Sequence, residues 1–265
     1  MNKDYSNIIT RQEKASRRLA LQVLIVFLII LLSSYYTGLL DSERMVEGIP
    51  SILQLAGESI PPNFSDVKGW LVPLLDTLAM SIAGTALAVF FSIPLGLLAA
   101  RNTSPHPVVY QISRGLLNAL RAIPELILGI IFVAAVGFGA LPGVLALGFH
   151  SIGMVGKFIS EAVEHVDNAP IEAAHAAGAT RFQMITHGVI PQVLPQIADV
   201  TIYRWEYNFR ASTVMGMVGA GGIGFELMSS LRLMRYDEVS AILLVILLMV
   251  TMVDGIGQYL RTKFK

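Results

Sequence analysis

The 265-residue chain contains no cysteine, which excludes disulfides and thiolate metal sites. Charged residues are scarce, at 14% against about 25% in soluble proteins, while 54% of the residues are hydrophobic. The formal net charge is zero, so no overall basic character indicates nucleic-acid binding. The phosphate-binding pattern G-x-x-x-x-G-K-[ST] is also absent, so the chain predicts no ATP site of its own. This composition indicates a protein whose solvent is the lipid bilayer.

Six hydrophobic stretches are long enough to cross a bilayer as helices, which requires roughly 20 mostly apolar residues. They are residues 19–36, 74–100, 109–136, 142–159, 189–209 and 239–259. Helices satisfy their own backbone in lipid, and no alternating strand pattern supports a barrel. The sequence therefore predicts an all-α membrane protein with about six transmembrane helices. The first stretch lacks a cleavage site, so we expect it to stay in the membrane.

Basic residues predict how the chain is oriented. Lys and Arg concentrate on one side of the membrane if both termini are placed in the cytoplasm. This orientation divides the chain into a cytoplasmic N-terminal segment over residues 1–18, a first transmembrane helix over 19–36, an extracytoplasmic loop over 37–73, a transmembrane core over 74–260 with a cytoplasmic loop at about 160–190, and a cytoplasmic tail over 261–265. The prediction is a multi-pass membrane protein with both ends inside the cell.

The cytoplasmic loop carries the signals of a short helix followed by a break. Pro170 suits the first helical position, residues 171–177 are rich in Ala, and Gly178 can adopt the left-handed conformation that ends a helix. Thr180 and Gln183 then fit a capping box that starts the next helix. Small Ala side chains let a partner surface approach closely. By spacing alone, the segment is equally an ordinary helix between two spans.

The same loop resembles the EAA loop of ABC-importer permeases. The match consists of Glu172-Ala173-Ala174, Gly178 and, thirteen residues later, Pro191. The family pattern places Ile and Leu three residues and one residue before this proline, where the chain has Gly188 and Ile190. In that family the loop sits in a groove of the cytoplasmic ATPase and transmits its closure. The resemblance therefore implies that Glu172, Ala173, Ala174 and Gly178 couple the chain to an ATPase.

Three further stretches, residues 121–126, 203–210 and 213–224, resemble the phosphonate-transport permease subfamily. With the EAA loop, the resemblance covers roughly residue 74 to the C-terminus. It implies a type I ABC-importer permease fold with a cytoplasmic coupling helix, in a bacterial inner membrane. It also implies a homodimer of this chain, an extracytoplasmic binding protein, and two cytoplasmic ATPase subunits that hold ATP and Mg. The implied function is import of phosphonate, phosphite or a phosphate ester by alternating access, with no catalytic activity and no cofactor in the chain itself.

Ionisable residues at membrane depth are costly, and they usually face a bundle interior or a water path. Four polar residues lie close together in the fifth stretch: Arg204, Glu206, Asn208 and Arg210. Arg204 and Asn208 share a helix face, and the spacing predicts an ion pair between Glu206 and Arg210. Because the planar fork of arginine suits an oxyanion, these residues are candidates for the translocation path or its gate. An ion-pair network that fastens the spans together is the alternative; it is favoured for Glu206 with Arg210, because a paired arginine has less to offer a substrate, and it explains Arg204 equally well.

A second polar group lies in the third stretch. Arg121 and Glu125 are spaced for an i,i+4 ion pair, and Pro124 between them predicts a bend in the helix. One interpretation is a kinked packing site with an internal pair. The other is a hinge or gate of the translocation path.

A glycine-rich run follows the fifth stretch. Gly219, Gly221 and Gly224 satisfy G-x-G-x-x-G, and Gly222 adds a fourth glycine. A dinucleotide site is not predicted, because that motif must join a strand to a helix. The run instead predicts a tight turn that re-enters the membrane and forms a gate near the binding protein. Helix packing through small residues is the alternative.

Two other functions stay open from the sequence. One is an ABC permease for another small solute, such as methionine, taurine or a quaternary ammonium compound, although the arginines disfavour a cation. The other is an intramembrane metal enzyme, because Glu172 and His175 have the E-x-x-H spacing of di-iron sites. A second such motif is absent, so no metal site is predicted.

Overall fold

The computed structural model describes residues 2–264, which form helices and connecting turns with no strand among them. The chain divides into two compact units, one ending at Glu58 and the other beginning at Ser59. The first unit contains α1 (Asn2–Tyr36) and α2 (Ser42–Glu58). Residues 11–36 of α1 are apolar enough to span a bilayer, and none of the most apolar window is buried within the structure.

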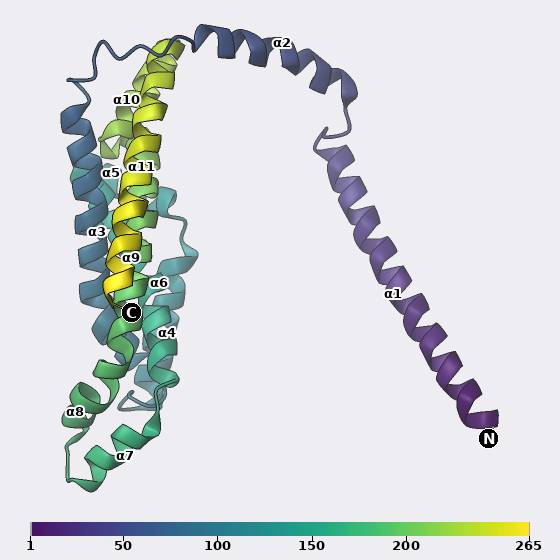
Figure 1. Ribbon diagram of the computed structural model, residues 1–265, viewed down its shortest axis with the longest axis vertical. Helices are drawn as coiled ribbons and strands as arrows, with labels where there is room; N and C mark the ends of the chain where they lie inside the picture. Colours follow the sequence, from purple (N-terminus) through teal and green to yellow (C-terminus); the bar gives the residue numbers. More distant parts are fainter. Residues whose placement is uncertain (1, 265) are drawn as a thin grey trace. The chain divides into compact units, whose positions relative to one another are not determined.

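The second unit is a helical bundle (Figure 1). Its elements are α3 (Leu71–Leu98), α4 (Pro107–Ala122), α5 (Glu125–Val136), α6 (Ala140–Glu164), α7 (Asn168–Ala176), α8 (Arg181–Met184), the π-helical segment η1 (Ile185–Val189), α9 (Ile190–Met215), a second π-helical segment η2 (Gly216–Ala220), α10 (Ile223–Arg232) and α11 (Tyr236–Phe264). The helices α7 and α8 lie at one end of the bundle and α10 lies at the other (Figure 1).

The predicted spans are present, but two of them are broken. Four helices are long and apolar enough to cross a membrane, over residues 11–36, 71–98, 140–164 and 236–263. The other two spans are bent pairs: α4 with α5 turns by 87°, and the segment from α8 to η2 turns by 58° into α10. The described residues therefore contain up to six spans, as the hydropathy pattern predicts. The third hydrophobic stretch is not one continuous helix, because α4 ends before Pro124.

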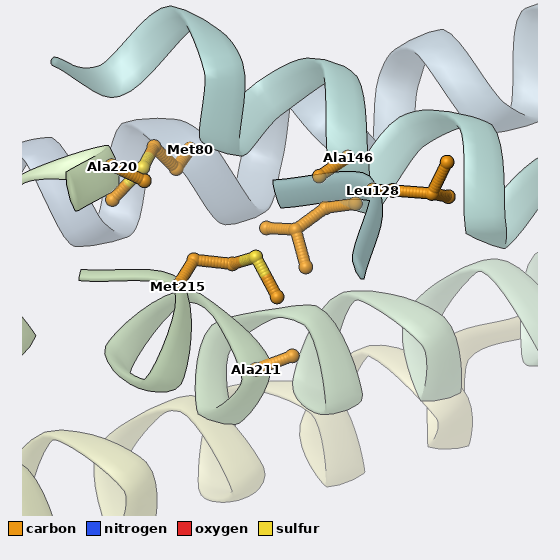
Figure 2. Close-up of a cluster of buried hydrophobic side chains, with 7 residues drawn as sticks. Met80, Leu128, Ala146, Ala211, Met215 and Ala220 are labelled. Atoms are coloured by element: carbon orange, nitrogen blue, oxygen red, sulfur yellow. The ribbon is translucent and has the colours of Figure 1, made fainter. Parts of the chain in front are cut away.

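The core of the second unit forms around α6, which packs against α3, α4, α5 and α9. Figure 2 shows one buried cluster, to which Met80 of α3, Leu128 of α5, Ala146 of α6 and Met215 of α9 contribute, with Met80 beside Ala220. The small Ala side chain lets the larger side chains from three neighbouring helices fill the space around α6. Lipid provides no hydrophobic force between helices, so this close packing is a main source of helix association.

At Gly153, α6 lies directly against the backbone of α4. A Cβ atom placed there would lie 2.6 Å from the backbone nitrogen of Arg121 and 2.7 Å from the carbonyl oxygen of Leu117. Because both contacts are backbone atoms, the two helices would have to separate to accept any side chain. Gly115 on α4 is a matched control, since no atom lies within 4 Å of its added Cβ.

We expect Gly153→Ala to destabilise the bundle by about 1–3 kcal/mol through overpacking. Gly115→Ala should instead leave stability unchanged or raise it, by up to about 1 kcal/mol, because Ala is the better helix former. Thermal unfolding of the purified variants in detergent, followed by circular dichroism, compares them directly. Equal melting temperatures for the two variants would contradict the tight α4–α6 contact.

Candidate functional site

A chain of polar side chains crosses the middle of the bundle. Arg204 on α9 is only 3% exposed, and its Nε donates a 2.7 Å hydrogen bond to the Oγ of Ser151 on α6. The Ser151 hydroxyl in turn donates to Oδ1 of Asn208, 3.1 Å away. The Asn208 amide then donates to the hydroxyl of Thr85 on α3 at 2.9 Å. Arg204 and Asn208 thus share one helix face, as their spacing predicts, and they join three helices.

Glu125 lies on the other side of Arg204. Its Oε1 accepts a 2.9 Å hydrogen bond from the Tyr207 hydroxyl, and its Oε2 lies 3.9 Å from Nη2 of Arg204. The Tyr207 ring covers the guanidinium, with Cζ of Arg204 4.2 Å from the ring centroid. His150 lies 3.7 Å from Glu125 Oε2 through Nε2, and its Nδ1 lies 3.1 Å from the carbonyl oxygen of Ile123. We call Glu125, His150, Ser151, Arg204, Tyr207 and Asn208 the central cluster.

The ion pair in the central cluster is incomplete. Nη2 of Arg204 and Oε2 of Glu125 are both buried, and neither has a hydrogen-bond partner in the described part of the chain. A buried polar atom without a partner costs about 1–3 kcal/mol, and more when it is charged. A further donor or acceptor that reaches these atoms would therefore stabilise the arrangement. An anion with several oxygens would provide acceptors for Arg204.

The predicted pair between Arg121 and Glu125 is wrong. The chain leaves the helical conformation at Ile123, and Pro124 precedes the first residue of α5. Proline disfavours the helical conformation in the residue before it, which explains the break at Ile123. Glu125 consequently turns toward α9, whereas the side chain of Arg121 is exposed.

The predicted pair between Glu206 and Arg210 is also wrong. Each residue instead pairs with α11, which packs along α9. The Glu206 carboxylate, in a residue only 5% exposed, accepts from Nη2 of Arg261. Arg210 pairs with Asp254, with 2.8 Å between Nη1 and Oδ1. Opposite charges on a neighbouring helix outcompete the i,i+4 partner, and the spacing within α9 could not show this.

The glycine run forms a backbone turn at the end of α9. The φ angles are +105° at Gly219, +75° at Gly221 and +72° at Gly222, a region that favours glycine. Gly224 has a different role, because a Cβ there would collide with the carbonyl oxygen of Thr213. The predicted tight turn is present. Its role as a gate stays a prediction.

The segment that resembles the EAA loop is an exposed helix with two defined ends. The side chain of Asp167 caps α7 by accepting a 3.0 Å hydrogen bond from the backbone of Ala169. Pro170 therefore occupies the third helical position rather than the predicted first one. Gly178 follows the helix with a φ of +82°, as predicted for a helix-ending glycine. Glu172 and Ala173 are exposed, and Ala174 is half-buried.

The predicted capping box at the start of α8 is present. The Thr180 hydroxyl accepts from the backbone nitrogen of Gln183, and Gln183 Oε1 accepts from the backbone nitrogen of Thr180 at 2.8 Å. Gly188, which departs from the family pattern, packs against α7. A Cβ there would lie 3.2 Å from Cγ1 of Ile171, so the small residue allows the two segments to approach.

Gln192 ties α7 to α9, and the sequence patterns give no indication of this role. Its Oε1 accepts a 2.9 Å hydrogen bond from the backbone nitrogen of Asp167, while its Nε2 lies 3.1 Å from the carbonyl oxygen of the same residue. Nε2 also donates to the carbonyl oxygen of Gly188 at 2.6 Å. One side chain thus connects the start of α7 with the start of α9, the helix that carries Arg204.

The side chains that could bind a metal do not gather. Within residues 11–43 and 45–263, where side chains are described, no group of three or more His, Asp or Glu could hold a metal ion. Glu172 and His175 lie on the short helix α7 without further ligands.

A bundle of intact and broken membrane spans around a buried polar cluster is the architecture of a transport protein. The chain belongs to the family of binding-protein-dependent transport system inner membrane components, whose model matches residues 92–265. It is 68% identical to the phosphite transport system permease protein PtxC of Stutzerimonas stutzeri over 92% of this chain and 89% of the relative. The putative phosphite transport system permease protein HtxC of the same organism is 38% identical, over 95% of this chain and 89% of that relative.

The fold is also that of solved importers. The structure matches the MetNI methionine ABC transporter in an inward-facing conformation with a TM-score of 0.66 and 20% identity, over 76% of this chain and 99% of that one. An amino acid ABC transporter matches with a TM-score of 0.63 and 18% identity, over 77% of this chain and 100% of that one. The chain is therefore the multi-pass permease subunit of an ABC importer with the type I fold, and not an enzyme. Its family implies separate ATPase subunits and a substrate-binding protein as partners.

The pair between Glu206 and Arg261 provides a stability test. Arg261→Gln should destabilise the bundle by about 3–5 kcal/mol, because it leaves the buried Glu206 carboxylate without its partner. The double variant Glu206→Gln with Arg261→Gln should recover most of this loss, since no buried charge remains. Thermal unfolding in detergent of both variants and the parent measures the difference. A double variant no more stable than Arg261→Gln would refute the pairing.

Proposed function

We propose that this chain imports a small phosphorus oxyanion, such as phosphite, phosphonate or a phosphate ester, by alternating access. The observation that carries the proposal is the buried Arg204, whose Nη2 lacks a hydrogen-bond partner beside Glu125. Relatives with 68% and 38% identity are named as phosphite permeases, which supports the same class of substrate.

The incomplete pair defines how the central cluster would handle an anion. A tetrahedral oxyanion that reaches Arg204 accepts from its free Nη2, and Glu125 then loses part of its attraction to the guanidinium. Tyr207 and His150 remain beside the carboxylate and hold it in place. Competition between Glu125 and the oxyanion keeps binding weak, so the substrate can leave again. Arg204 is thus a substrate-contacting group and Glu125 a gate.

The transport path requires a second wall, and we propose that a second copy of this chain provides it. The face of α5 that follows Glu125 exposes Ile127, Ile130 and Ile131, at 48%, 56% and 53%. Glu125 begins α5 on the other side of the helix, in line with the buried Leu128 and Gly129, and keeps a side-chain exposure of 19%. A homodimer would cover the isoleucines and bring two central clusters to one path, together with the outlying Arg121.

The proposed orientation puts α7 and both termini in the cytoplasm, where the ATPases bind, and the glycine turn on the opposite side, where the binding protein delivers its ligand. Closure of the ATPases on Glu172 and the neighbouring alanines would move α7. Gln192, a residue of α9, passes this movement on, because it bonds to Asp167 at the start of α7. Movement of α7 would therefore reach α9, the helix that carries Arg204.

Arg204→Ala should reduce phosphite uptake at least tenfold, because it removes a charge-assisted hydrogen bond to the oxyanion. Glu125→Gln should lower the KM for uptake several-fold, since the competing carboxylate charge is lost. Uptake is measured in proteoliposomes that contain the importer and its binding protein, and copurification of the ATPase reports assembly.

Arg210→Ala is the control, since it removes an arginine of the same helix that already pairs with Asp254. We expect it to retain most of the uptake. If Arg204→Ala lost ATPase copurification as completely as it lost uptake, the residue would be structural and the proposed substrate contact would fail.

The connection through α7 predicts a separate defect. Gln192→Leu removes the two hydrogen bonds that join Asp167 to α9, so ATP hydrolysis should continue while uptake falls at least fivefold. Gly178→Val should have a similar effect, because a β-branched residue is strained at a φ of +82°. Gly178→Asn is the matched control, since Asn tolerates this conformation better. The ratio of solute imported to ATP hydrolysed measures coupling, and an unchanged ratio in Gln192→Leu would refute this route.

A further inference from the structure

A pocket of about 390 Å³ lies at the end of the bundle next to α7. One wall is the loop after α3, with Arg101, Asn102 and Thr103, and the opposite wall includes Asn168 and Arg181. It belongs neither to the central cluster nor to Glu172 and its neighbouring alanines. Its lining contains two arginines and four neutral polar residues, and no carboxylate.

The loop that forms the first wall is held firmly on α6. Asn102 Nδ2 donates a 2.6 Å hydrogen bond to the carbonyl oxygen of Val163, and the backbone nitrogen of Arg101 donates to Glu164 Oε1 at 3.0 Å. The Thr103 hydroxyl donates to the carbonyl oxygen of Leu97 at 2.6 Å. Because these bonds hold the loop before any ligand arrives, Arg101 is preorganised as part of a site.

The acidic residues next to this pocket are engaged elsewhere and form no ion pair with its two arginines. Glu164 pairs with Arg114 at 3.1 Å, and Asp167 caps the backbone of α7. In the described part of the chain, neither Arg101 nor Arg181 has a carboxylate within the 4.0 Å of an ion pair. The Nε of Arg101 donates to the Tyr110 hydroxyl at 3.2 Å, and this bond raises the pKa of Arg101. Both guanidinium groups therefore retain donors for a ligand.

We infer that this pocket binds one small phosphorus oxyanion between Arg101 and Arg181. Planar guanidinium groups match the oxygens of such anions, and the amides of Asn102 and Asn168 can supply additional donors. An anion at this position joins the fixed loop on α6 to the start of α8, beside the segment that we expect to meet the ATPase. The inference rests on the proposed function for the cytoplasmic location and for the class of ligand.

The test uses the full-length chain in nanodiscs of phosphatidylcholine, with binding of ³²P-labelled inorganic phosphate measured by equilibrium dialysis at constant ionic strength. We expect Arg101→Ala and Arg181→Ala each to weaken phosphate binding about tenfold or more, because each removes a charge-assisted contact. Arg181→Lys should weaken it less, since the charge is kept and only the fork is lost. Arg232→Ala, which removes an exposed arginine at the other end of the bundle, should bind like the parent.

Three results would overturn the inference. The first is no phosphate binding by the parent chain, or equal binding by Arg181→Ala. The second is binding that disappears with Arg204→Ala but persists with Arg181→Ala, which would assign the anion to the central cluster and leave the proposed function standing. The third is binding that is lost when phosphatidylglycerol replaces part of the phosphatidylcholine, which would make a lipid headgroup the occupant. Loss of uptake from outside in Arg204→Ala tests the proposed function independently of all three.

Discussion

Burial of the Arg204 guanidinium inside a membrane bundle imposes the main constraint on this structure. A charge at membrane depth must find partners within the protein, because lipid offers none. Ser151, Glu125 and Tyr207 supply them from three different helices, and Asn208 extends the chain of bonds to Thr85 on α3. The residues that stabilise the buried charge of Arg204 therefore also hold the helices together. The guanidinium is nevertheless not fully satisfied, because its Nη2 has no hydrogen-bond partner in the described part of the chain. The proposed contact with substrate depends on this free donor.

Non-helical backbone occurs at two places in the bundle, beside the central cluster and at the end of α9. The break before Pro124 turns Glu125 toward α9, and the positive φ angles of Gly219, Gly221 and Gly222 end that helix at the other side. In a bilayer, such non-helical backbone is tolerated only where protein or water surrounds it. Both breaks are set against packed helices, and both adjoin elements that an alternating-access mechanism would have to move.

Arginines at two depths of the bundle differ in how their charge is balanced. Arg204 is buried and shares Glu125 with Tyr207 and His150, whereas Arg101 and Arg181 line an open pocket near α7 without a carboxylate. Arg210 of α9 pairs with Asp254 of α11, and Arg261 of α11 pairs with Glu206 of α9, so both pairs fasten α11 to α9. The count of arginines in a span therefore says little about an anion path. The unfilled hydrogen-bond positions of each arginine distinguish a binding group from a structural one.

The sequence by itself determined the membrane class, the six hydrophobic stretches, the helix-ending Gly178 and the capping box at Thr180, because these depend on composition or on neighbours within one turn. It also placed Arg204 and Asn208 on one face, since helical spacing is local. Tertiary structure alone decided three contacts. Glu206 pairs with Arg261, and Glu125 lies beside Arg204 rather than Arg121. Gln192 forms hydrogen bonds with Asp167. These partners lie on different helices, and their meeting depends on helix register and on the bend at Pro124. No pattern within a single helix encodes that register, which close packing against α6 and α11 sets.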